Sequence, residues 1–381
     1  MLTVREVAEK DIIPLAEFFP TEPPFRSTTK ETWLRRFNTW WTANPAYTDQ
    51  FPRGWILEND TSIVGFIGNI PVKFRIGREV KTAVASVTWY VVPSVRGLFS
   101  IRLFTEFLKQ KNVSLFLYNT DNKDIIPILS RYKFKEYTLP RFQTKYYLML
   151  QRSKMDFIVR KFLINEDSEE DLTSLTELLA VFKRFGLLMC AYLFQKPVIR
   201  RDVLPDKDYT TSLCTFCDDT FSRIWEPFLQ ACDVTLSRDT QTLNWIYFSS
   251  IEPNKRVVIQ CRRSRDNSLA GYMVFDIFRK TTSDVGKMQL MDLCLGDKDP
   301  RVMASLLSYA IEIGKQHNAA LLVLWADSQE TESYLRNTFL LRSGFQHHNY
   351  LRLSDGLKEN SESLIVCPSF IAPPRGVDHF P

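Results

Sequence analysis

The chain has 381 residues and a formal net charge of +5, and its hydrophobic and charged fractions, 45% and 24%, are ordinary for a soluble globular protein. This length exceeds one ordinary hydrophobic core and suits two domains of roughly 150 to 200 residues each. The weak net charge argues against a nucleic-acid-binding protein, because such proteins usually carry a concentrated basic stripe. We therefore expect no nucleic acid as a partner; a bound anionic ligand would explain a few basic residues equally well.

The seven cysteines are scattered and odd in number, which favours a reducing compartment and a cytoplasmic protein. Cys214 and Cys217 form the only CxxC, and the four histidines offer no second ligand pair, so no metal site is expected. The opening residues, MLTVREVAEKD, lack the apolar core of a signal peptide. The apolar segment 186–194 is too short to cross a bilayer, so we expect no transmembrane segment.

The first part of the chain is expected to form an α/β unit, because alternating apolar runs and amphipathic stretches follow one another with turn residues between them. The expected strands are 2–6, 54–58, 62–74, 83–92 and 114–118. The expected helices are 11–19, 30–42, one that begins near Leu98, and 124–132. Turns are expected at Asn59-Asp60 and Gly77-Arg78.

The pattern changes after residue 150. An acidic run followed by a long helical stretch indicates a helical connector. The second half then repeats the first weakly, which suggests two copies of one fold. The matching pairs, in the same order, are 35–45 with 243–253, 63–69 with 269–276, and 129–134 with 340–345, the last pair being a helix end followed by an aromatic residue. The expected division is an N-terminal domain at 1–150, a connector at 151–205 and a degenerate C-terminal domain at 206–381.

The most informative stretch is 87–134, which reads VTWYVVPSVRGLFSIRLFTEFLKQKNVSLFLYNTDNKDIIPILSRYKF. An apolar strand stops at Pro93, a tight turn follows at Arg96-Gly97, and a helix begins. Backbone N–H groups at such a turn and helix N-terminus can hold a pyrophosphate. A second strand leads to Asn122, twelve residues before Phe134. This order of elements and residues resembles the GNAT superfamily of N-acetyltransferases, and the whole chain resembles a bacterial tandem-GNAT protein.

The resemblance implies an α/β fold with two tandem GNAT-like domains, each a mixed, mostly antiparallel sheet flanked by helices. It also implies that the strand end contacts the pantetheine arm of the coenzyme and that the following turn wraps its pyrophosphate. The residues that would bind acetyl-CoA or another acyl-CoA are Val91, Val92, Arg96, Gly97, Leu98, Phe99, Ser100 and Asn122. The turn departs from the family pattern, since Phe99 and Ile101 stand where small residues let the backbone approach the phosphates.

The family's tyrosine, which protonates the departing thiolate, would fall at Leu129. Tyr118 and Tyr132 are the nearby candidates for this catalytic role, because the pKa of a phenol, about 10, lies near that of an alkyl thiol. The alternative, that both rings fill an aromatic core, stays open. Candidates for the general base, by location alone, are Glu58, Asp60 and Glu106.

The second copy is expected to have lost coenzyme binding. Its equivalent turn carries Gly296, Asp297 and Asp299, and acidic residues there repel a pyrophosphate. Packing or acceptor recognition is the expected role of this copy. Asp276 and Asp292 are candidate acceptor contacts.

The resemblance implies an acyl-CoA-dependent N-acyltransferase whose partner is a small-molecule amine acceptor. Tandem proteins of this kind resemble bacterial GNAT proteins of polysaccharide or cell-surface biosynthesis, so an amino sugar or a cell-surface precursor is the acceptor that this analogy suggests. Two alternatives stay open: a relative of the Fem-type aminoacyl transferases, which take aminoacyl-tRNA, and a non-catalytic tandem scaffold. The sequence leaves the oligomeric state open.

Overall fold

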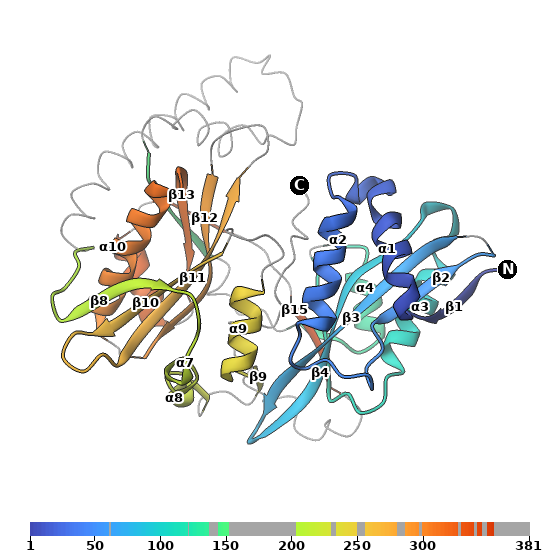
Figure 1. Ribbon diagram of the computed structural model, residues 1–381, viewed down its shortest axis with the longest axis horizontal. Coiled ribbons are helices and arrows are strands. Elements are labelled where there is room, and N and C mark those ends of the chain that lie inside the picture. The colour runs from blue at the N-terminus through green and yellow to red at the C-terminus, as the bar shows by residue number, and fades with distance from the viewer. Residues whose placement is uncertain are drawn as a thin grey trace, which may run out of the picture. The chain divides into compact units, whose positions relative to one another are not determined.

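The computed structural model describes residues 1–60, 62–120, 122–136, 144–151, 203–229, 234–249, 256–279, 286–296, 299–326, 329–338, 341–344 and 349–353. These residues pack into two compact units (Figure 1). Those of unit 1 fall within Met1–Thr138, Phe228–Glu252 and His347–Phe380, and those of unit 2 within Leu139–Pro227 and Pro253–Gln346.

The units are discontinuous in sequence, whereas the expected division cuts the chain at residues 150 and 205. Strand β7 (Thr144–Met149) precedes the first expected boundary, yet it pairs within the sheet of unit 2. Most of the expected connector, residues 152–202, lies outside the described residues. The division into 1–150, 151–205 and 206–381 therefore stays a prediction.

Unit 1 is built on a mixed sheet in the order β1-β2-β3-β4-β5-β15-β6, with β9 beside β3. Among its described strands only β4 and β5 run parallel. The long hairpin of β3 and β4 is rich in β-branched and aromatic residues and turns at Gly77. The bounds are β1 Thr3–Glu6, β2 Gly54–Glu58, β3 Ile63–Ile76, β4 Glu79–Val91, β5 Leu115–Asn119, β6 Lys135–Glu136, β9 Val234–Leu236 and β15 Asn349–Leu353.

Helices cover both faces of this sheet (Figure 1). On β3, Phe66 contacts Phe19 beyond the end of α1, whereas its neighbour Ile67 packs in a cluster with Leu103 of α3. Adjacent strand residues point to opposite faces, so α1 and α3 lie on opposite sides. The helices are α1 Ile12–Phe18, α2 Lys30–Phe37, α3 Leu98–Leu108, α4 Ile126–Arg131 and α9 Thr240–Phe248, with single turns η1 Glu9–Asp11, η2 Phe19–Thr21, η3 Pro23–Phe25, η4 Asn38–Thr42 and η5 Pro93–Val95.

The core on the α1–α2 face is aromatic. Phe19 stacks on Trp33 with ring centroids 3.9 Å apart, and Phe37 stacks on Trp41 at 4.9 Å. The Trp41 indole donates to the Asn69 carbonyl at 3.0 Å, so a buried donor is satisfied. Offset aromatic contacts of this kind fix ring positions as well as burying area, which makes this face a rigid support for β3 and β4.

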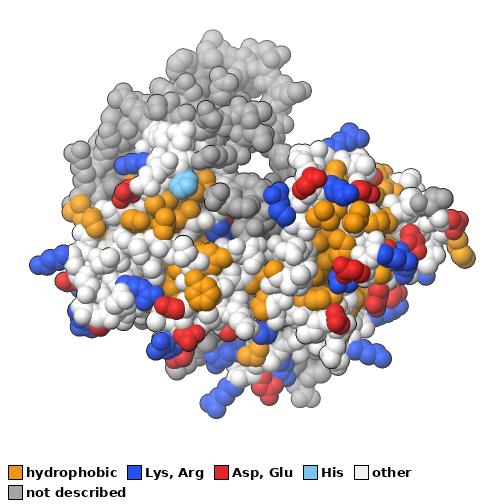
Figure 2. Space-filling view, in the orientation of Figure 1, with side chains coloured by type: hydrophobic (Ala, Val, Ile, Leu, Met, Phe, Trp, Pro, Cys, Tyr) orange, Lys and Arg blue, Asp and Glu red, His pale blue; other side chains and the backbone are white. Residues whose placement is uncertain are grey.

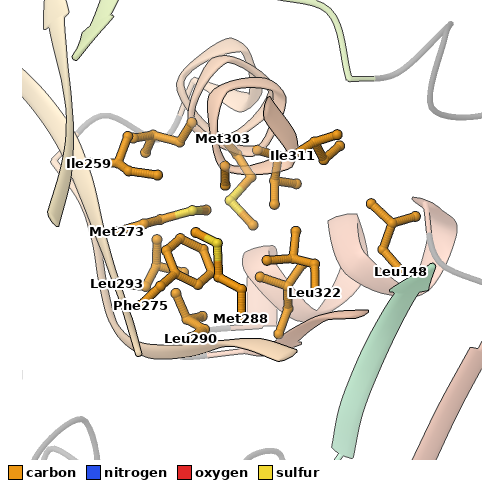
Figure 3. Close-up of a cluster of buried hydrophobic side chains, with 14 of the residues drawn as sticks. Leu148, Ile259, Met273, Phe275, Met288, Leu290, Leu293, Met303, Ile311 and Leu322 are labelled. Atoms are coloured by element: carbon orange, nitrogen blue, oxygen red, sulfur yellow. The ribbon is translucent and has the colours of Figure 1, made fainter. Parts of the chain in front are cut away.

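Unit 2 repeats the strand order of unit 1, as β8-β10-β11-β12-β13-β7-β14, with only β12 and β13 parallel among its described strands. Helix α10 packs on the sheet, and Figure 3 shows Met303 and Ile311 of α10 above Met273, Met288 and Leu322. The bounds are β8 Tyr209–Cys214, β10 Arg256–Arg263, β11 Leu269–Arg279, β12 Gly286–Leu295, β13 Ala319–Trp325, β14 Leu341–Gly344, α7 Asp219–Arg223, α8 Glu226–Leu229, α10 Pro300–Gln316 and α11 Gln329–Thr338.

Each sheet contains strands from both halves of the chain: the sheet of unit 1 includes β9 and β15 from the second half, and that of unit 2 includes β7 from the first. β15, near the end of the sequence, lies between β5 and β6 of unit 1 and pairs Tyr350 with Tyr118. β7 takes the equivalent place between β13 and β14 in unit 2, and its Leu148 enters the core in Figure 3. This reciprocal exchange means that neither sheet is complete without the other half of the sequence.

The elements expected from the sequence are largely confirmed. The strand expected at 54–58 is β2, and the helix expected near Leu98 begins there. One expectation is wrong: the repeat pattern places a helix end at residues 340–345, whereas Leu341–Gly344 is strand β14, paired with β7. A partner strand from a distant part of the chain overrides local propensity there.

No helix in the described part of the chain is both long enough and apolar enough to cross a membrane. On the face shown in Figure 2, basic and acidic side chains are interspersed and do not gather into a region of one sign. This distribution is typical of an ordinary solvated surface.

Two glycines with positive φ give a matched test of backbone packing. A Cβ on Gly54, where φ is +144°, would lie 2.3 Å from the Ile67 carbonyl oxygen, whereas a Cβ on Gly77, where φ is +61°, would meet nothing within 4 Å. We expect Gly54→Ala to lower the free energy of unfolding by more than about 3 kcal/mol, and Gly77→Ala by about 1 kcal/mol, because only the first adds a collision to the strain. Urea unfolding of both variants measures this, and equal losses would contradict it.

Candidate functional site

The centre of unit 1 contains a break between its two parallel strands. β4 and β5 pair only from Ala83 with Leu115 to Ala85 with Leu117. Beyond that point β4 continues to Val91, paired with β3 on its other side. Among the described residues, no strand pairs with the β5 side of residues 86–91. Apart from the Val91 carbonyl, which accepts from Arg96 Nε, the backbone donors and acceptors on this edge are therefore open to an extended ligand.

The open segment of β4 contains a bulge. Between the pairs Gly68–Val87 and Phe66–Tyr90, β4 has two residues where β3 has one. One of the two is Thr88, whose φ is +50°, an unfavourable conformation for a β-branched residue that costs on the order of 1–3 kcal/mol. Strain of this kind is found most often where a backbone group must be aimed at a ligand.

Three buried polar atoms in the same segment lack a hydrogen-bond partner among the described residues: Ser86 Oγ, Thr88 Oγ1 and Trp89 Nε1. Leaving such an atom unsatisfied costs about 1–3 kcal/mol each. Their concentration in four consecutive residues on an unpaired strand edge indicates a place that a polar ligand completes.

The turn after β4 leads directly into α3. Gly97 has a φ of +87° and is the N-cap of the helix, with no side chain capping it. The first helical bond comes from Ile101 to the Gly97 carbonyl, so the N–H groups of residues 97–100 have no partner within the helix. Leu98 is 78% exposed, and Phe99 packs against the core on the α3 face. The ring expected to crowd the turn is thus partly buried against this core, and the helix N-terminus remains open to an anion.

Arg96 folds back over the end of β4. Its Nε donates to the Val91 carbonyl at 2.7 Å, and its guanidinium carbon lies 5.5 Å from the centre of the Tyr90 ring. The side chain is exposed. It therefore stands between the open strand and the open helix end, as a cation beside both. Val92 continues the strand end, with its N–H bonded to the Val64 carbonyl.

Tyr118 and Tyr132 both contact Phe104 of α3, with ring centroids 6.0 and 5.4 Å away. Tyr118 immediately follows the last parallel pair, and its ring meets Trp89 of the bulge at 6.2 Å. The Tyr132 hydroxyl lies 3.2 Å from Thr105 Oγ1. The structure thus brings both tyrosines to the α3 face beside the break in the sheet. Leu129, where the family has its tyrosine, is fully buried. The catalytic role of either tyrosine stays a prediction.

Asn122 is exposed and serves the turn that leads to α4. Its Oδ1 accepts from the Asp124 N–H at 2.9 Å, and its carbonyl accepts from the Ile125 N–H. A local turn role is typical of asparagine at this kind of position. Its contact with the coenzyme stays a prediction.

The three carboxylates considered as general bases have cationic partners. Glu58 pairs with Arg5 at 2.8 Å, Asp60 with the N-terminal ammonium at 2.7 Å, and Glu106 with Lys109 at 2.8 Å. Each of the three is therefore engaged with a group outside the open segment of β4.

A different carboxylate, Glu22, does contact this segment, and sequence reasoning missed it. The Tyr90 hydroxyl donates to Glu22 Oε2 at 2.7 Å. Burial, the hydrogen bond to Glu22 and the nearby carboxylate charge raise the pKa of Tyr90 to about 12. The two residues are 68 positions apart, so no local motif could have shown the pair.

The equivalent place in unit 2 is closed. Asp299 caps α10 by accepting from the Arg301 N–H at 2.9 Å, and it also accepts from Tyr209. A Cβ on Gly296 would lie 2.3 Å from Ile224 Cγ1, so the segment around α7 and α8 packs on this turn. A capped and covered helix end is a poor site for a phosphate. That the second copy has lost coenzyme binding stays a prediction.

The two acidic candidates for acceptor contact in unit 2 have internal roles. Asp276 forms a two-bond ion pair with Arg256, its partner across the β10–β11 ladder, at 2.6 and 2.7 Å. Asp292 is fully buried and accepts from the Leu293 N–H. In both residues the carboxylate therefore makes a structural contact inside unit 2.

No protein-family model and no curated protein matches the sequence. Solved structures match over most of the chain. A protein of unknown function from Enterococcus faecalis V583, called a probable N-acyltransferase, has a TM-score of 0.56 at 10% identity over 93% of this chain and 73% of that one. A GCN5-related N-acetyltransferase from Anabaena variabilis has a TM-score of 0.55 at 8% identity, with coverages of 93% and 73%.

The N-myristoyltransferase of Saccharomyces cerevisiae, solved with bound myristoyl-CoA, has a TM-score of 0.52 at 12% identity over 92% of this chain and 78% of that one. These structures share the GNAT-type fold, which confirms the expected α/β class with two mixed sheets flanked by helices. The identities are low, so the likeness is one of fold.

Asp299 offers a test of the closed helix end by pH. Hydrogen bonds from Arg301 hold the pKa of Asp299 at about 2, below its ordinary value of 3.8. A lowered carboxyl pKa stabilises the folded state above about pH 4, and the stabilisation is lost as the pH falls through about 2. We expect Asp299→Asn to be less stable than the wild type at pH 7, with the difference shrinking as the pH falls from 4 to 2.

Urea unfolding of the full chain across this pH range measures the effect. Asparagine also caps helices well, so the variant isolates the charge; Asp299→Ala should cost about a further 1 kcal/mol by removing the cap. A difference that stays constant with pH would show that the charge of Asp299 does not stabilise the fold.

Proposed function

We propose that the protein is an acyl-CoA-dependent N-acyltransferase, with acetyl-CoA as the simplest donor and a small-molecule amine as the acceptor. One observation carries the proposal: the unpaired edge of β4, residues 86–91, is followed, after the single turn η5, by the uncapped N-terminus of α3. An extended chain that ends in a pyrophosphate has the two chemistries that this edge and this helix end would bind.

The helix end supports the pyrophosphate part of the proposal. The N–H groups of residues 97–100 and the dipole of an 11-residue helix favour an anion. Arg96 adds a cation whose Nε holds the Val91 carbonyl. A phosphate would give the guanidinium a charge-assisted partner. The exposed Leu98 and the inward Phe99 leave the backbone of the turn accessible.

The strand edge supports the pantetheine part. The amides of pantetheine can pair with an open strand in the way that another strand would. The unsatisfied atoms of Ser86, Thr88 and Trp89 add polar groups beside this edge. An acyl-CoA supplies the activated thioester; the protein's share is to bind it, to orient its carbonyl and to exclude water.

Transfer to an amine releases a thiolate that must take up a proton. We propose Tyr118 for this role; it follows the last β4–β5 pair and contacts Trp89 across the break. Tyr132, beside Thr105, is the second candidate. A phenol near pKa 10 is matched to an alkyl thiol, so proton transfer between them is close to balanced.

We further propose an amino sugar or a cell-surface precursor as the acceptor, on the analogy with bacterial tandem-GNAT proteins, and a cytoplasmic location. The buried thiols Cys214, Cys217, Cys261 and Cys294 support a reducing compartment. The open helix end favours a coenzyme A donor over the aminoacyl-tRNA of the Fem-type alternative.

Calorimetric titration with acetyl-CoA tests the proposal. We expect micromolar binding by the wild type, and binding at least about tenfold weaker by Arg96→Ala, because one charge-assisted phosphate contact is lost. Arg102→Ala is the matched control, since Arg102 is an exposed arginine in the second turn of the same helix, beyond the open N–H groups.

The control should bind acetyl-CoA like the wild type. An absence of binding by the wild type at millimolar acetyl-CoA would overturn the proposal. Equal weakening in Arg96→Ala and Arg102→Ala would assign the effect to net charge instead of a contact at the turn.

A further inference from the structure

N-acylation of an amine requires a base near the acceptor. Primary amines are protonated at neutral pH, and only the neutral amine attacks a thioester. The carboxylates expected from sequence for this role are held in ion pairs elsewhere in unit 1. The open segment of β4 has another carboxylate bonded to it, Glu22, to which the proposed function gives no role.

Glu22 occupies a fixed position between two single-turn helices. η2 ends at Thr21 and η3 begins at Pro23. The Glu22 N–H donates to the Phe19 carbonyl at 3.0 Å, and the Glu22 carbonyl accepts from the Phe25 N–H at 2.9 Å. The prolines that follow restrict the backbone further. The backbone that carries the carboxylate is therefore held by the fold.

Tyr90 links this carboxylate to the open strand. It lies on β4 between the bulge and Val91, is 7% exposed, and its ring packs edge-on against Phe25 with centroids 5.2 Å apart. Its neighbour Trp89 packs on Phe104, on the α3 face. Since adjacent strand residues point to opposite faces, Tyr90 and Glu22 approach β4 from the side away from α3 and the tyrosine candidates.

We propose that Glu22 binds the ammonium group of a cationic primary amine acceptor and takes up its proton, with Tyr90 as the residue that positions the carboxylate. The inference rests on the proposed function and names the class of its acceptor. In the transfer step the ammonium gives one proton to the Glu22 carboxylate, and the neutral amine nitrogen then attacks the thioester carbonyl. The C–N bond forms, the C–S bond breaks, the second amine proton leaves to solvent and the coenzyme thiolate takes a proton from the acid on the α3 face.

The two carboxylate oxygens of Glu22 have different contacts. The Tyr90 hydroxyl uses Glu22 Oε2, so Oε1 faces away from that bond; its other neighbour is Thr21 Oγ1 at 3.5 Å, the limit of hydrogen-bonding distance. The phenol of Tyr90 is protonated at neutral pH, as an ordinary tyrosine is, so it donates to the carboxylate. Arg96, 5.5 Å from the Tyr90 ring, is the charged group that faces the pair from the turn.

Binding of two coenzyme A thioethers tests the inference and does not require the natural acceptor. One probe carries an aminoalkyl chain on sulfur, about four or six carbons long to span the reach of an extended chain, and the other the matched alkyl chain without the amine. Calorimetry at pH 7 gives the ratio of their affinities for the wild type, Glu22→Gln and Tyr90→Phe. Glutamine keeps the shape and the bond from Tyr90, and phenylalanine keeps the ring packing.

We expect the wild type to prefer the amino probe by about tenfold or more at one of the two lengths, because a charged hydrogen bond is gained. Glu22→Gln should bind the alkyl probe like the wild type, which also shows that it is folded, and should lose the preference. Tyr90→Phe should keep part of the preference for the amino probe.

A preference that survives in Glu22→Gln would overturn the inference, as would tight binding of both probes by the wild type without any preference. These results would leave the proposed function standing. Failure of both probes to bind the wild type would instead remove the proposed function, and the inference with it.

Discussion

The end of pairing between β4 and β5, after Ala85 and Leu117, is the constraint on which the account of unit 1 depends. If the parallel pairing continued to Val91, β5 would occupy the backbone hydrogen-bonding groups on this edge of β4. The bulge at Thr88 and the unsatisfied polar atoms around it would then have no ligand to contact. Because pairing stops, β4 presents backbone groups along residues 86–91 and then ends at a helix whose first N–H groups have no partner within the helix. The edge and the helix end are covalently continuous, so one extended anionic ligand can use both.

The two units show what this arrangement requires, since they share a strand order but differ at the helix end. In unit 2 the β12–β13 pairing also stops early, after Gln289 with Val323. Its following helix, however, is capped by Asp299, and Ile224 packs on the turn before it. The same topology is thus open in one unit and closed in the other. This difference comes from a few side chains at one turn and makes unit 1 the better candidate for the proposed chemistry.

Local patterns in the sequence were sufficient for most of unit 1. Gly97 after Arg96 marked the start of α3, and the β-branched runs marked β2 to β4. Contacts between distant residues were beyond such patterns. No local pattern predicts that β15 joins the sheet of unit 1 or that β7 joins the sheet of unit 2. The place of each strand depends on strands that are distant in the sequence. The Glu22–Tyr90 bond was missed for the same reason. Phe99 was expected to crowd the turn, but helical geometry directs its ring to the core.

The most direct test of the central claim is amide hydrogen exchange of the full chain with and without saturating coenzyme A, read at peptide resolution. We expect protection to increase in peptides covering residues 86–92 and 97–100, and the peptides around Asp299 in the closed turn of unit 2 not to change. Protection confined to unit 2, or no change in the β4–α3 peptides under conditions where calorimetry shows saturation, would contradict the claim that this strand edge and helix end form the coenzyme site.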